Sequence, residues 1–306
     1  MNAATWLPRD HRLFEEQARA QAMAPERAYK SALAAHRARS DDAATVCWMS
    51  GSSTVTRTLR ADGGHTIVGR HTACDVIVND DPAVSLRHLL VRSAVLDDGA
   101  PRVSILDLRT VAGFSLSTGS RQRSVQTTGP VALRLGASTV IVLPSGEWPD
   151  ELPDPEVDGA SEIPAVAALA VREAMSISRI TMSPSPRHVG ERPTVSGYDW
   201  ELELTSVRAR AAVWISNDDL ARGLLIGRAD RCVDEGLRRT FDLDVSRVHV
   251  LLQRQGEQTL LFDLASTQGT FADGKRVRRV TLEPGTAVTF AQKNPVKLRL
   301  RGPSSS

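Results

Sequence analysis

The chain has 306 residues, a formal net charge of +2 and an apolar fraction of 41%, which fit about two folded domains. The weak charge and the 4% aromatic content argue against direct nucleic-acid binding, and no apolar run approaches the roughly 20 residues that span a membrane. Residues 1–10 lack the apolar stretch of a secretory signal. The three cysteines, Cys47, Cys74 and Cys232, lie too far apart to suggest a metal motif or a disulfide framework. We therefore expect a soluble, cytoplasmic protein without a bound metal.

The first predicted element is a helical segment within residues 1–42. Asp10 suits a helix N-cap, and Pro25 suits the first position of a second helix, in which Tyr29 and Leu33 lie four residues apart. The apolar face of this segment is narrow. We expect it either to pack against the next domain or to act as a separate docking element.

Residues 43–145 and 198–303 change to a strand pattern. Short runs of β-branched and aliphatic residues alternate with turn residues in both regions, and Asp273-Gly274 is a hairpin signal in the second region. Many short strands with glycine-containing turns are typical of β-sandwiches. The sequence therefore predicts an all-β protein with two sandwich domains.

Residues 146–197 are predicted to link these domains. The segment is rich in proline and, in its first part, in acidic residues, a composition that favours an unstructured linker. Residues 163–180 are rich in alanine and predict one short helix that begins near Pro164. Thr181 and Thr194 are candidate phosphoacceptors in the second half of the linker.

One pattern occurs in both predicted domains. Residues 66–108 contain Gly69-Arg70, then Ser85-Leu86-Arg87-His88, then Asp107-Leu108. Residues 224–264 contain Gly227-Arg228, then Ser246-Arg247-Val248-His249, then Asp263-Leu264. The same motifs in the same order at similar spacing indicate an internal duplication, so each copy should be compared with the other.

The repeated pattern resembles the forkhead-associated (FHA) domain family, with two tandem copies of which the first is partly degenerate. In that family a Gly-Arg follows a strand, Ser-x-x-His lies in a later loop, and a Thr-Asn-Gly type of turn follows Asp-Leu. The resemblance implies two FHA-type β-sandwiches that bind phosphothreonine peptides. It implies no cofactor and no catalytic residues.

The resemblance assigns roles to five residues of the second copy. The arginine faces the phosphate, the serine donates to a phosphate oxygen, the next residue borders the peptide, the threonine lines the pocket and the residue at the asparagine position binds the peptide backbone. A near-dianionic phosphate with three acceptor oxygens suits one guanidinium combined with neutral donors. The implied phosphopeptide-binding residues are Arg228, Ser246, Arg247, Thr267 and Gln268.

The first copy keeps fewer of these groups. Arg70 and Ser85 are its weaker candidates for phosphopeptide binding, because Leu86, Val111 and Ala112 stand where the family has polar groups. Losing one or two hydrogen bonds to a charged group, each contributing about 1.5–3 kcal/mol, would weaken affinity substantially. We expect the second domain to be the main reader and the first to be a weak reader or a structural surface.

The two histidines of the repeated motif are expected to be structural. The resemblance implies that His88 and His249 brace the recognition loops, and no phosphate-cradling glycine-rich loop, metal-ligand cluster or nucleophile–base pair is visible in the sequence. The chain is therefore predicted not to be an enzyme.

The sequence thus favours a non-catalytic phosphothreonine-binding adaptor in Ser/Thr kinase signalling. Its partner would be a phosphothreonine-containing protein, either a kinase substrate or the kinase itself. Phosphorylation at Thr181 or Thr194 would also allow self-association through the linker. The alternative is a phosphate-independent interaction scaffold that uses FHA-like domains.

Overall fold

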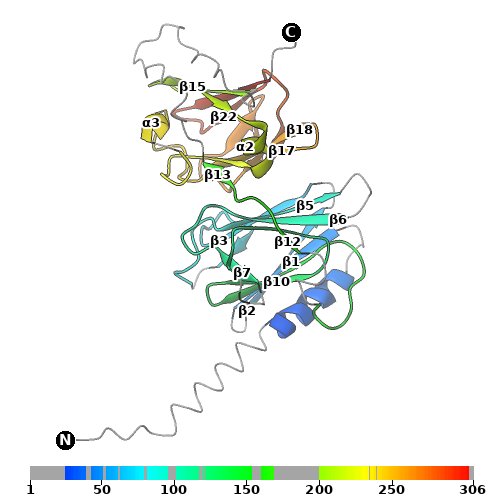
Figure 1. Ribbon diagram of the computed structural model, residues 1–306. Helices are drawn as coiled ribbons and strands as arrows, with labels where there is room; N and C mark the ends of the chain where they lie inside the picture. Colours follow the sequence, from blue (N-terminus) through cyan, green and yellow to red (C-terminus); the bar gives the residue numbers. More distant parts are fainter. Residues whose placement is uncertain are drawn as a thin grey trace, which may run out of the picture.

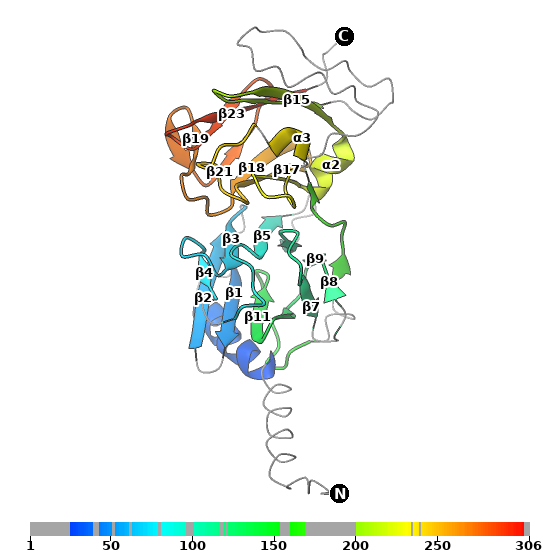
Figure 2. The ribbon, with the colours of Figure 1, turned by 90° about the vertical axis from the view of Figure 1, so that its left-hand side faces the viewer.

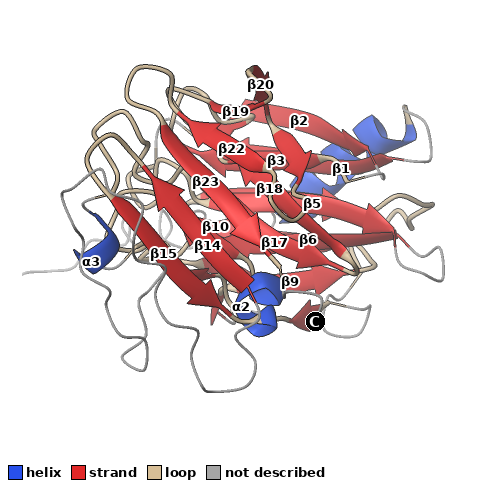
Figure 3. Ribbon diagram, turned by 90° about the horizontal axis from the view of Figure 1, so that it is seen from above, coloured by secondary structure: helices blue, strands red, loops and turns tan. Residues whose placement is uncertain are grey.

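The computed structural model describes residues 25–38, 43–50, 53–60, 63–78, 81–95, 101–116, 119, 121–153, 160–168, 200–233, 235–238 and 240–302. About half of these residues lie in strands, and the strands form two β-sandwiches, one above the other, with a sheet of one facing a sheet of the other (Figure 1). Strands dominate the view from above as well (Figure 3). The predicted all-β fold class is confirmed.

Two sheets make up the first sandwich. One has the strand order β2-β1-β11-β10-β7-β8 and the other has the order β12-β9-β6-β5-β3-β4. The strands are β1 (Ala43–Ser50), β2 (Ser53–Arg60), β3 (His65–Gly69), β4 (Val76–Ile77), β5 (Leu89–Val95), β6 (Pro101–Asp107), β7 (Phe114–Leu116), β8 (Arg121–Gln122), β9 (Ser124–Thr127), β10 (Val131–Leu135), β11 (Ser138–Leu143) and β12 (Ser161–Glu162).

The second sandwich also has two sheets, with the strand orders β15-β14-β23-β22-β19-β20 and β13-β16-β17-β18-β21. Its strands are β13 (Ala167–Ala168), β14 (Trp200–Thr205), β15 (Arg210–Ile215), β16 (Leu224–Ile226), β17 (Val250–Gln255), β18 (Gln258–Asp263), β19 (Thr270–Ala272), β20 (Lys275–Val277), β21 (Arg279–Thr281), β22 (Ala287–Phe290) and β23 (Val296–Arg301). Two short helices, α2 (Asn217–Arg222) and α3 (Glu235–Arg238), lie between its strands.

The two sandwiches share one topology. When β14 is matched to β1 and the strands are followed along the chain, β15-β14-β23-β22-β19-β20 repeats the order β2-β1-β11-β10-β7-β8. In the facing sheet, β16-β17-β18-β21 likewise repeats β3-β5-β6-β9. This agreement is what a duplication of one domain produces.

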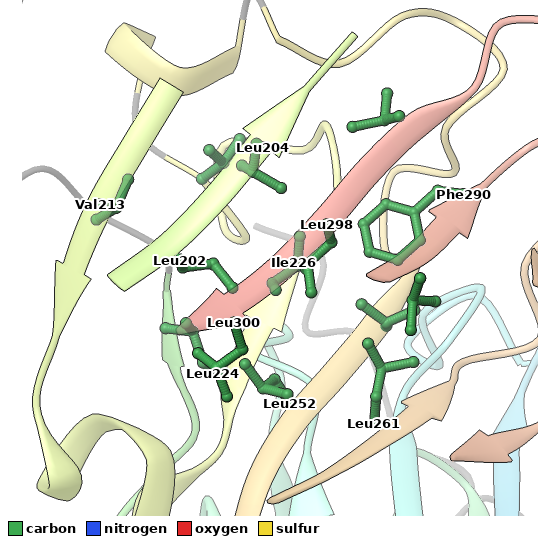
Figure 4. Packing of buried hydrophobic residues seen from close by; sticks show 14 of the residues in the cluster. Leu202, Leu204, Val213, Leu224, Ile226, Leu252, Leu261, Phe290, Leu298 and Leu300 are labelled. Atoms are coloured by element: carbon green, nitrogen blue, oxygen red, sulfur yellow. The ribbon is translucent and has the colours of Figure 1, made fainter. Parts of the chain in front are cut away.

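Each sandwich has its own apolar core. The core of the second is shown in Figure 4, where Leu202 and Leu298 of one sheet meet Leu252 and Leu261 of the other. These side chains are fully buried, and burying a leucine contributes about 1.5–3 kcal/mol. Alternate residues of each strand face inward, as expected when two sheets pack face to face.

A helix over residues 25–37 packs on the outer face of the first sheet. Tyr29 and Leu33 are buried there against Ile141, and the Tyr29 hydroxyl donates to the carbonyl oxygen of Pro149 at 2.7 Å. Of the two expected arrangements, the structure therefore shows packing against the first domain. The predicted N-cap Asp10 lies outside the described residues.

The start of the linker differs from the prediction. Residues 163–168 are extended rather than helical, so the predicted helix is wrong over this stretch. β12 pairs with β9 of the first sandwich and β13 pairs with β16 of the second. The backbone N–H and C=O groups of β12 and β13 form hydrogen bonds with the edge strands β9 and β16 instead of within a helix. This pairing outweighs the helical preference of alanine. The remainder of the predicted helix lies outside the described residues.

The two sandwiches also contact each other directly. An apolar cluster joins Ile67 and Leu106 of the first sandwich to Leu251 and Phe262 of the second, and all four side chains are fully buried. The guanidinium of Arg92 lies 5.7 Å from the centre of the Phe262 ring. Figure 2 shows the sheet containing β3 and β5 next to the sheet containing β17 and β18. The domains therefore share a buried interface as well as a linker.

Within the part of the chain that the structure describes, no helix combines the length and the apolar character needed to cross a membrane.

Candidate functional site

A pocket of about 210 Å³ lies at one end of the second sandwich. It is bordered by the segment after β16, the segment before β17 and the turn between β18 and β19. All five residues predicted for the second copy line this single pocket: Arg228, Ser246, Arg247, Thr267 and Gln268. Residues far apart in sequence are thus brought together by the strand ends.

The position of Arg228 depends on the glycine before it. A Cβ atom at Gly227 would lie 2.5 Å from the carbonyl oxygen of Arg247, so the two backbone segments approach too closely for any other residue. The backbone N–H of Arg228 donates to the Ser246 carbonyl at 3.2 Å, and its Nε donates to the Val245 carbonyl at 2.9 Å. These bonds fix the guanidinium at the pocket while its terminal nitrogens make no hydrogen bond with another described residue.

The hydroxyl of Ser246 is positioned so that it can donate its proton to a molecule in the pocket. Its side chain is largely buried, and its Oγ accepts a hydrogen bond from the backbone N–H of Thr267 at 3.0 Å. Because the oxygen is occupied as an acceptor, the hydroxyl proton can point toward a ligand in the pocket. The same bond joins the segment before β17 to the turn after β18.

The buried side chain of His249 connects the segment before β17 to the turn after β18. Its Nδ1 accepts the backbone N–H of Ser246 at 3.0 Å, which places the proton on Nε2, 3.2 Å from the carbonyl oxygen of Gly269. Burial is the main cause that lowers the pKa of this imidazole to about 4. The ring is therefore neutral at pH 7 and acts as a fixed link between the loops rather than as a proton donor to a ligand.

The turn that presents Thr267 and Gln268 is organised by Asp263. The carboxylate of Asp263 accepts the backbone N–H of Ser266 at 2.9 Å and the hydroxyl of Thr270 at 2.6 Å. Sequence reasoning did not assign roles to Ser266 or Thr270. The signal was present, because an aspartate followed three residues later by serine is typical of a side-chain-stabilised turn.

The corresponding end of the first sandwich has the same internal framework. Arg70 donates from Nε to the carbonyl oxygen of Val84, Ser85 donates its backbone N–H to His88 Nδ1 at 3.0 Å, and His88 Nε2 lies 2.8 Å from the Gly113 carbonyl oxygen. Burial is likewise the main cause that lowers the pKa of His88.

The exposed side chains of the turn are where the two ends differ. Val111, at the position of Thr267, is 92% exposed and offers no hydrogen bond from its side chain. Ala112, at the position of Gln268, is also exposed. The first end thus keeps Arg70 and Ser85 close to each other, since the Arg70 N–H donates to the Ser85 carbonyl at 3.1 Å, but it lacks the polar turn.

Residues 224–291 match the family model of the FHA domain. The second domain is an FHA domain. The match begins at β16 and ends after β22, so it contains all five pocket residues named above.

Solved structures of FHA domains are also similar to part of the chain. The FHA domain of the CT664 protein from Chlamydia trachomatis is 18% identical, with a TM-score of 0.28 over 34% of this chain and 96% of that one. The FhaA FHA domain complexed with the intracellular domain of Rv3910 is 27% identical, with a TM-score of 0.26 over 32% and 98%. An FHA domain studied for phosphothreonine-dependent interactions is 27% identical, with a TM-score of 0.28 over 35% and 98%. These scores are low, so the assignment depends on the family match. A search of curated proteins gave no match.

The pocket of the FHA domain has a further boundary that the sequence did not predict. His71, Leu86 and Arg87 of the first sandwich also line it. No local pattern marks them, because they become neighbours of Arg228 only when the two sandwiches pack together. Leu86, which follows Ser85 in the first copy of the repeated motif, thus lines the pocket of the FHA domain.

The charge around the FHA pocket is mainly positive. Arg228 and Arg247 are joined by Arg87 of the first sandwich, and Asp244 is the acidic residue that lines the pocket. The Asp244 carboxylate accepts a hydrogen bond from Asn294 Nδ2 at 2.6 Å. The arrangement suits an anion that accepts several hydrogen bonds.

The hydrogen bonds of His249 bear on whether Ser246 could act as a nucleophile. His249 Nδ1 accepts from the backbone of Ser246, so it is not placed to remove the proton from the Ser246 hydroxyl. No group of three or more His, Cys, Asp or Glu side chains in the described part of the chain could hold a metal ion.

Proposed function

We propose that this protein is a non-catalytic adaptor that binds phosphothreonine-containing partners through its FHA domain, residues 198–303. In this proposal residues 43–145 form a weaker reader or a structural surface. The observation that carries the proposal is that the guanidinium of Arg228 and the hydroxyl of Ser246 line one pocket of about 210 Å³.

The chemistry of the pocket fits a phosphate ester. A phosphothreonine side chain brings close to two negative charges and three strong acceptor oxygens. Arg228 supplies guanidinium donors and Ser246 supplies a hydroxyl donor whose own oxygen is already occupied. Each hydrogen bond to a charged group contributes about 1.5–3 kcal/mol. The exposed Thr267 and Gln268 can then contact the peptide around the phosphate.

The partner we propose is a substrate of a Ser/Thr kinase or the kinase itself, in the same compartment as this protein. Cys47, Cys74 and Cys232 are free and buried, which suits a reducing compartment, and we place the protein in the cytoplasm for this reason. Thr181 and Thr194, on which self-association through a phosphorylated linker depends, lie outside the described residues.

The test is a titration of the full chain with three matched peptides that carry phosphothreonine, phosphoserine or threonine at one position. We expect binding of the phosphothreonine peptide and at least about tenfold weaker binding after Arg228→Ala, which removes a charged donor. Arg70→Ala is the matched control, because this arginine occupies the same framework position in the first sandwich. It should leave most of the affinity in place.

The competing function is a phosphate-independent scaffold. The observation that favours it is Val111, a large apolar residue that is 92% exposed at the end of the first sandwich. Equal binding of phosphorylated and unphosphorylated peptides, or full binding by Arg228→Ala, would support the scaffold and contradict the phosphothreonine reader.

A further inference from the structure

Two domains contribute to the FHA pocket. Arg228, Ser246 and the turn after β18 form its base, while His71 and Leu86 of the first sandwich line it from outside the FHA domain. Leu86 follows Ser85 in the first copy of the repeated motif, as Arg247 follows Ser246 in the second. The same motif position therefore lines one pocket from both domains, with an apolar residue from one and a cation from the other.

We propose that the first domain forms a wall of the phosphopeptide site of the FHA domain, and that Leu86 together with Leu243 selects an apolar side chain adjoining the phosphothreonine of the partner. The inference rests on the proposed function and adds the substrate preference of the same site. In this arrangement the first domain acts as part of the reader of the second domain.

The wall is held rigidly against the FHA domain. Arg87, next to Leu86, is 4% exposed, and its guanidinium donates to the carbonyl oxygens of Leu264 at 2.6 Å and Ala265 at 2.5 Å. In return, Arg231 Nη2 donates to the carbonyl oxygen of Arg87 at 3.2 Å. The backbone on both sides of the contact is thus fixed by charged donors, directly before the turn that carries Thr267.

Two residues of the wall, Leu86 and His71, are uncharged at pH 7. Arg87 keeps its positive charge, and its guanidinium donates to two carbonyl oxygens of the FHA domain. His71 is joined to Leu86 by a hydrogen bond from the His71 N–H to the Leu86 carbonyl at 2.9 Å. Burial, followed by the nearby charge of Arg87, lowers the pKa of the His71 imidazole, which keeps it uncharged at pH 7. In the proposed site Arg228 binds the phosphate and Arg247 borders the peptide.

Two leucines give this pocket an apolar part. Leu243 of the FHA domain is 79% exposed, and Leu86 of the first domain is half-buried. Both line the pocket that contains the proposed phosphate ligands. An apolar side chain of the partner that removes them from water should strengthen binding by about tenfold relative to alanine at the same position. The side chains of Leu86 and Leu243 offer neither a charge nor a hydrogen-bond donor to an acidic side chain.

The preference can be measured with the full chain and phosphothreonine peptides in which each flanking position is in turn leucine, alanine or glutamate. For the wild-type protein we expect one flanking position at which leucine binds about tenfold more tightly than alanine. Leu86→Arg should remove this preference and make glutamate the favoured residue at that position. Leu86→Ala and Leu243→Ala should weaken the leucine preference without creating one for glutamate.

Val111→Arg is the matched control, because it makes the same change at an exposed apolar residue of the first domain that does not line the pocket. It should leave the peptide preference of the wild type intact. Melting curves of each variant check that the fold is retained, and the two alanine variants provide the readout if Leu86→Arg is unstable.

The inference is overturned if the wild type shows no apolar preference, or if the Leu86 variants keep the wild-type preference while Arg228→Ala abolishes phosphopeptide binding. The second outcome would leave the proposed function standing. If Arg228→Ala binds phosphopeptide as tightly as the wild type, the proposed function itself fails, and the inference fails with it. The two failures are thus distinguishable in one set of titrations.

Discussion

The recognition ends of the two sandwiches have the same framework and different surfaces. In each, a glycine permits close approach of two loops, an arginine Nε donates to a backbone carbonyl, and a buried histidine joins the loop to the next turn. The exposed positions then diverge, with Thr267 and Gln268 at one end and Val111 and Ala112 at the other. The framework of these loops is therefore the same in both sandwiches while their exposed side chains differ.

The interior of the repeated motif shows a second difference. Val248 of the FHA domain is 2% exposed, and Arg87 at the same motif position of the first domain is 4% exposed. Arg87 reaches carbonyl oxygens of the FHA domain. Both copies of this loop therefore reach the domain interface, the FHA domain through apolar packing of Val248 and the first domain through the hydrogen bonds of Arg87.

The largest expected effect comes from the two framework glycines. A Cβ atom at Gly227 would lie 2.5 Å from the Arg247 carbonyl oxygen, and one at Gly69 would lie 2.4 Å from the Leu86 carbonyl oxygen. We expect Gly227→Ala and Gly69→Ala each to lower the free energy of unfolding by about 3 kcal/mol. The added Cβ atom would force the neighbouring backbone segment to move. Urea unfolding and peptide titration should show that Gly227→Ala also loses most phosphopeptide binding.

Gly256→Ala is the control for these substitutions. A Cβ atom there meets nothing within 4 Å, although φ is +52°. Its cost should be the strain of the left-handed backbone alone, about 1 kcal/mol. If the three variants are equally stable, the close approach of the loops is not what requires glycine.

Acid should destabilise the recognition ends through their histidines. The pKa of His249 is lowered to about 4 and that of His88 is also lowered, in both cases mainly by burial. A group with a lowered pKa in the folded state contributes stability that is complete above its unfolded pKa near 6.5 and is lost as the pH falls toward 4. For His249 this amounts to about 3 kcal/mol.

Urea unfolding at a series of pH values between 7 and 5 measures this effect where few carboxylates titrate. The free energy of unfolding should fall with pH, and the slope should be reduced in His249→Gln. A flat profile over this range in the wild type would contradict neutral histidines as links between the loops.

The sequence could predict the pocket-lining residues that come from one copy and not those that the other copy contributes. Arg228, Ser246 and Thr267 lie in short motifs whose order is visible along the chain, and they meet in one pocket. That Leu86 also lines this pocket could not be predicted, because its neighbours in the FHA domain are set by the packing of two sheets, which no local pattern records. Over residues 163–168 the predicted linker helix is wrong for a related reason, since pairing of β13 with β16 overrides local propensity.

A smaller effect is expected from the interface arginine. Arg87→Ala leaves the carbonyl oxygens of Leu264 and Ala265 without their donor, which should cost about 2 kcal/mol of stability. Phosphopeptide affinity should fall by a few fold, because the turn before Thr267 loses its support. Thermal unfolding and titration of the full chain measure both. Arg87→Lys, which keeps the charge, should lie between the wild type and Arg87→Ala, and unchanged stability of Arg87→Ala would argue against the interface.

The smallest expected effect is a gain of binding in the first domain. In an Arg228→Ala background, Val111→Thr with Ala112→Asn restores polar groups at the turn while Arg70 and Ser85 remain on their framework. One added hydrogen bond contributes about 1 kcal/mol, so the residual phosphopeptide affinity should rise by several fold to about tenfold. Adding Arg70→Ala to this variant should cancel the gain if the first domain is the source. No gain at all would mean that its loop serves the interface alone, because Arg87 already commits the backbone beside Ser85 to the FHA domain.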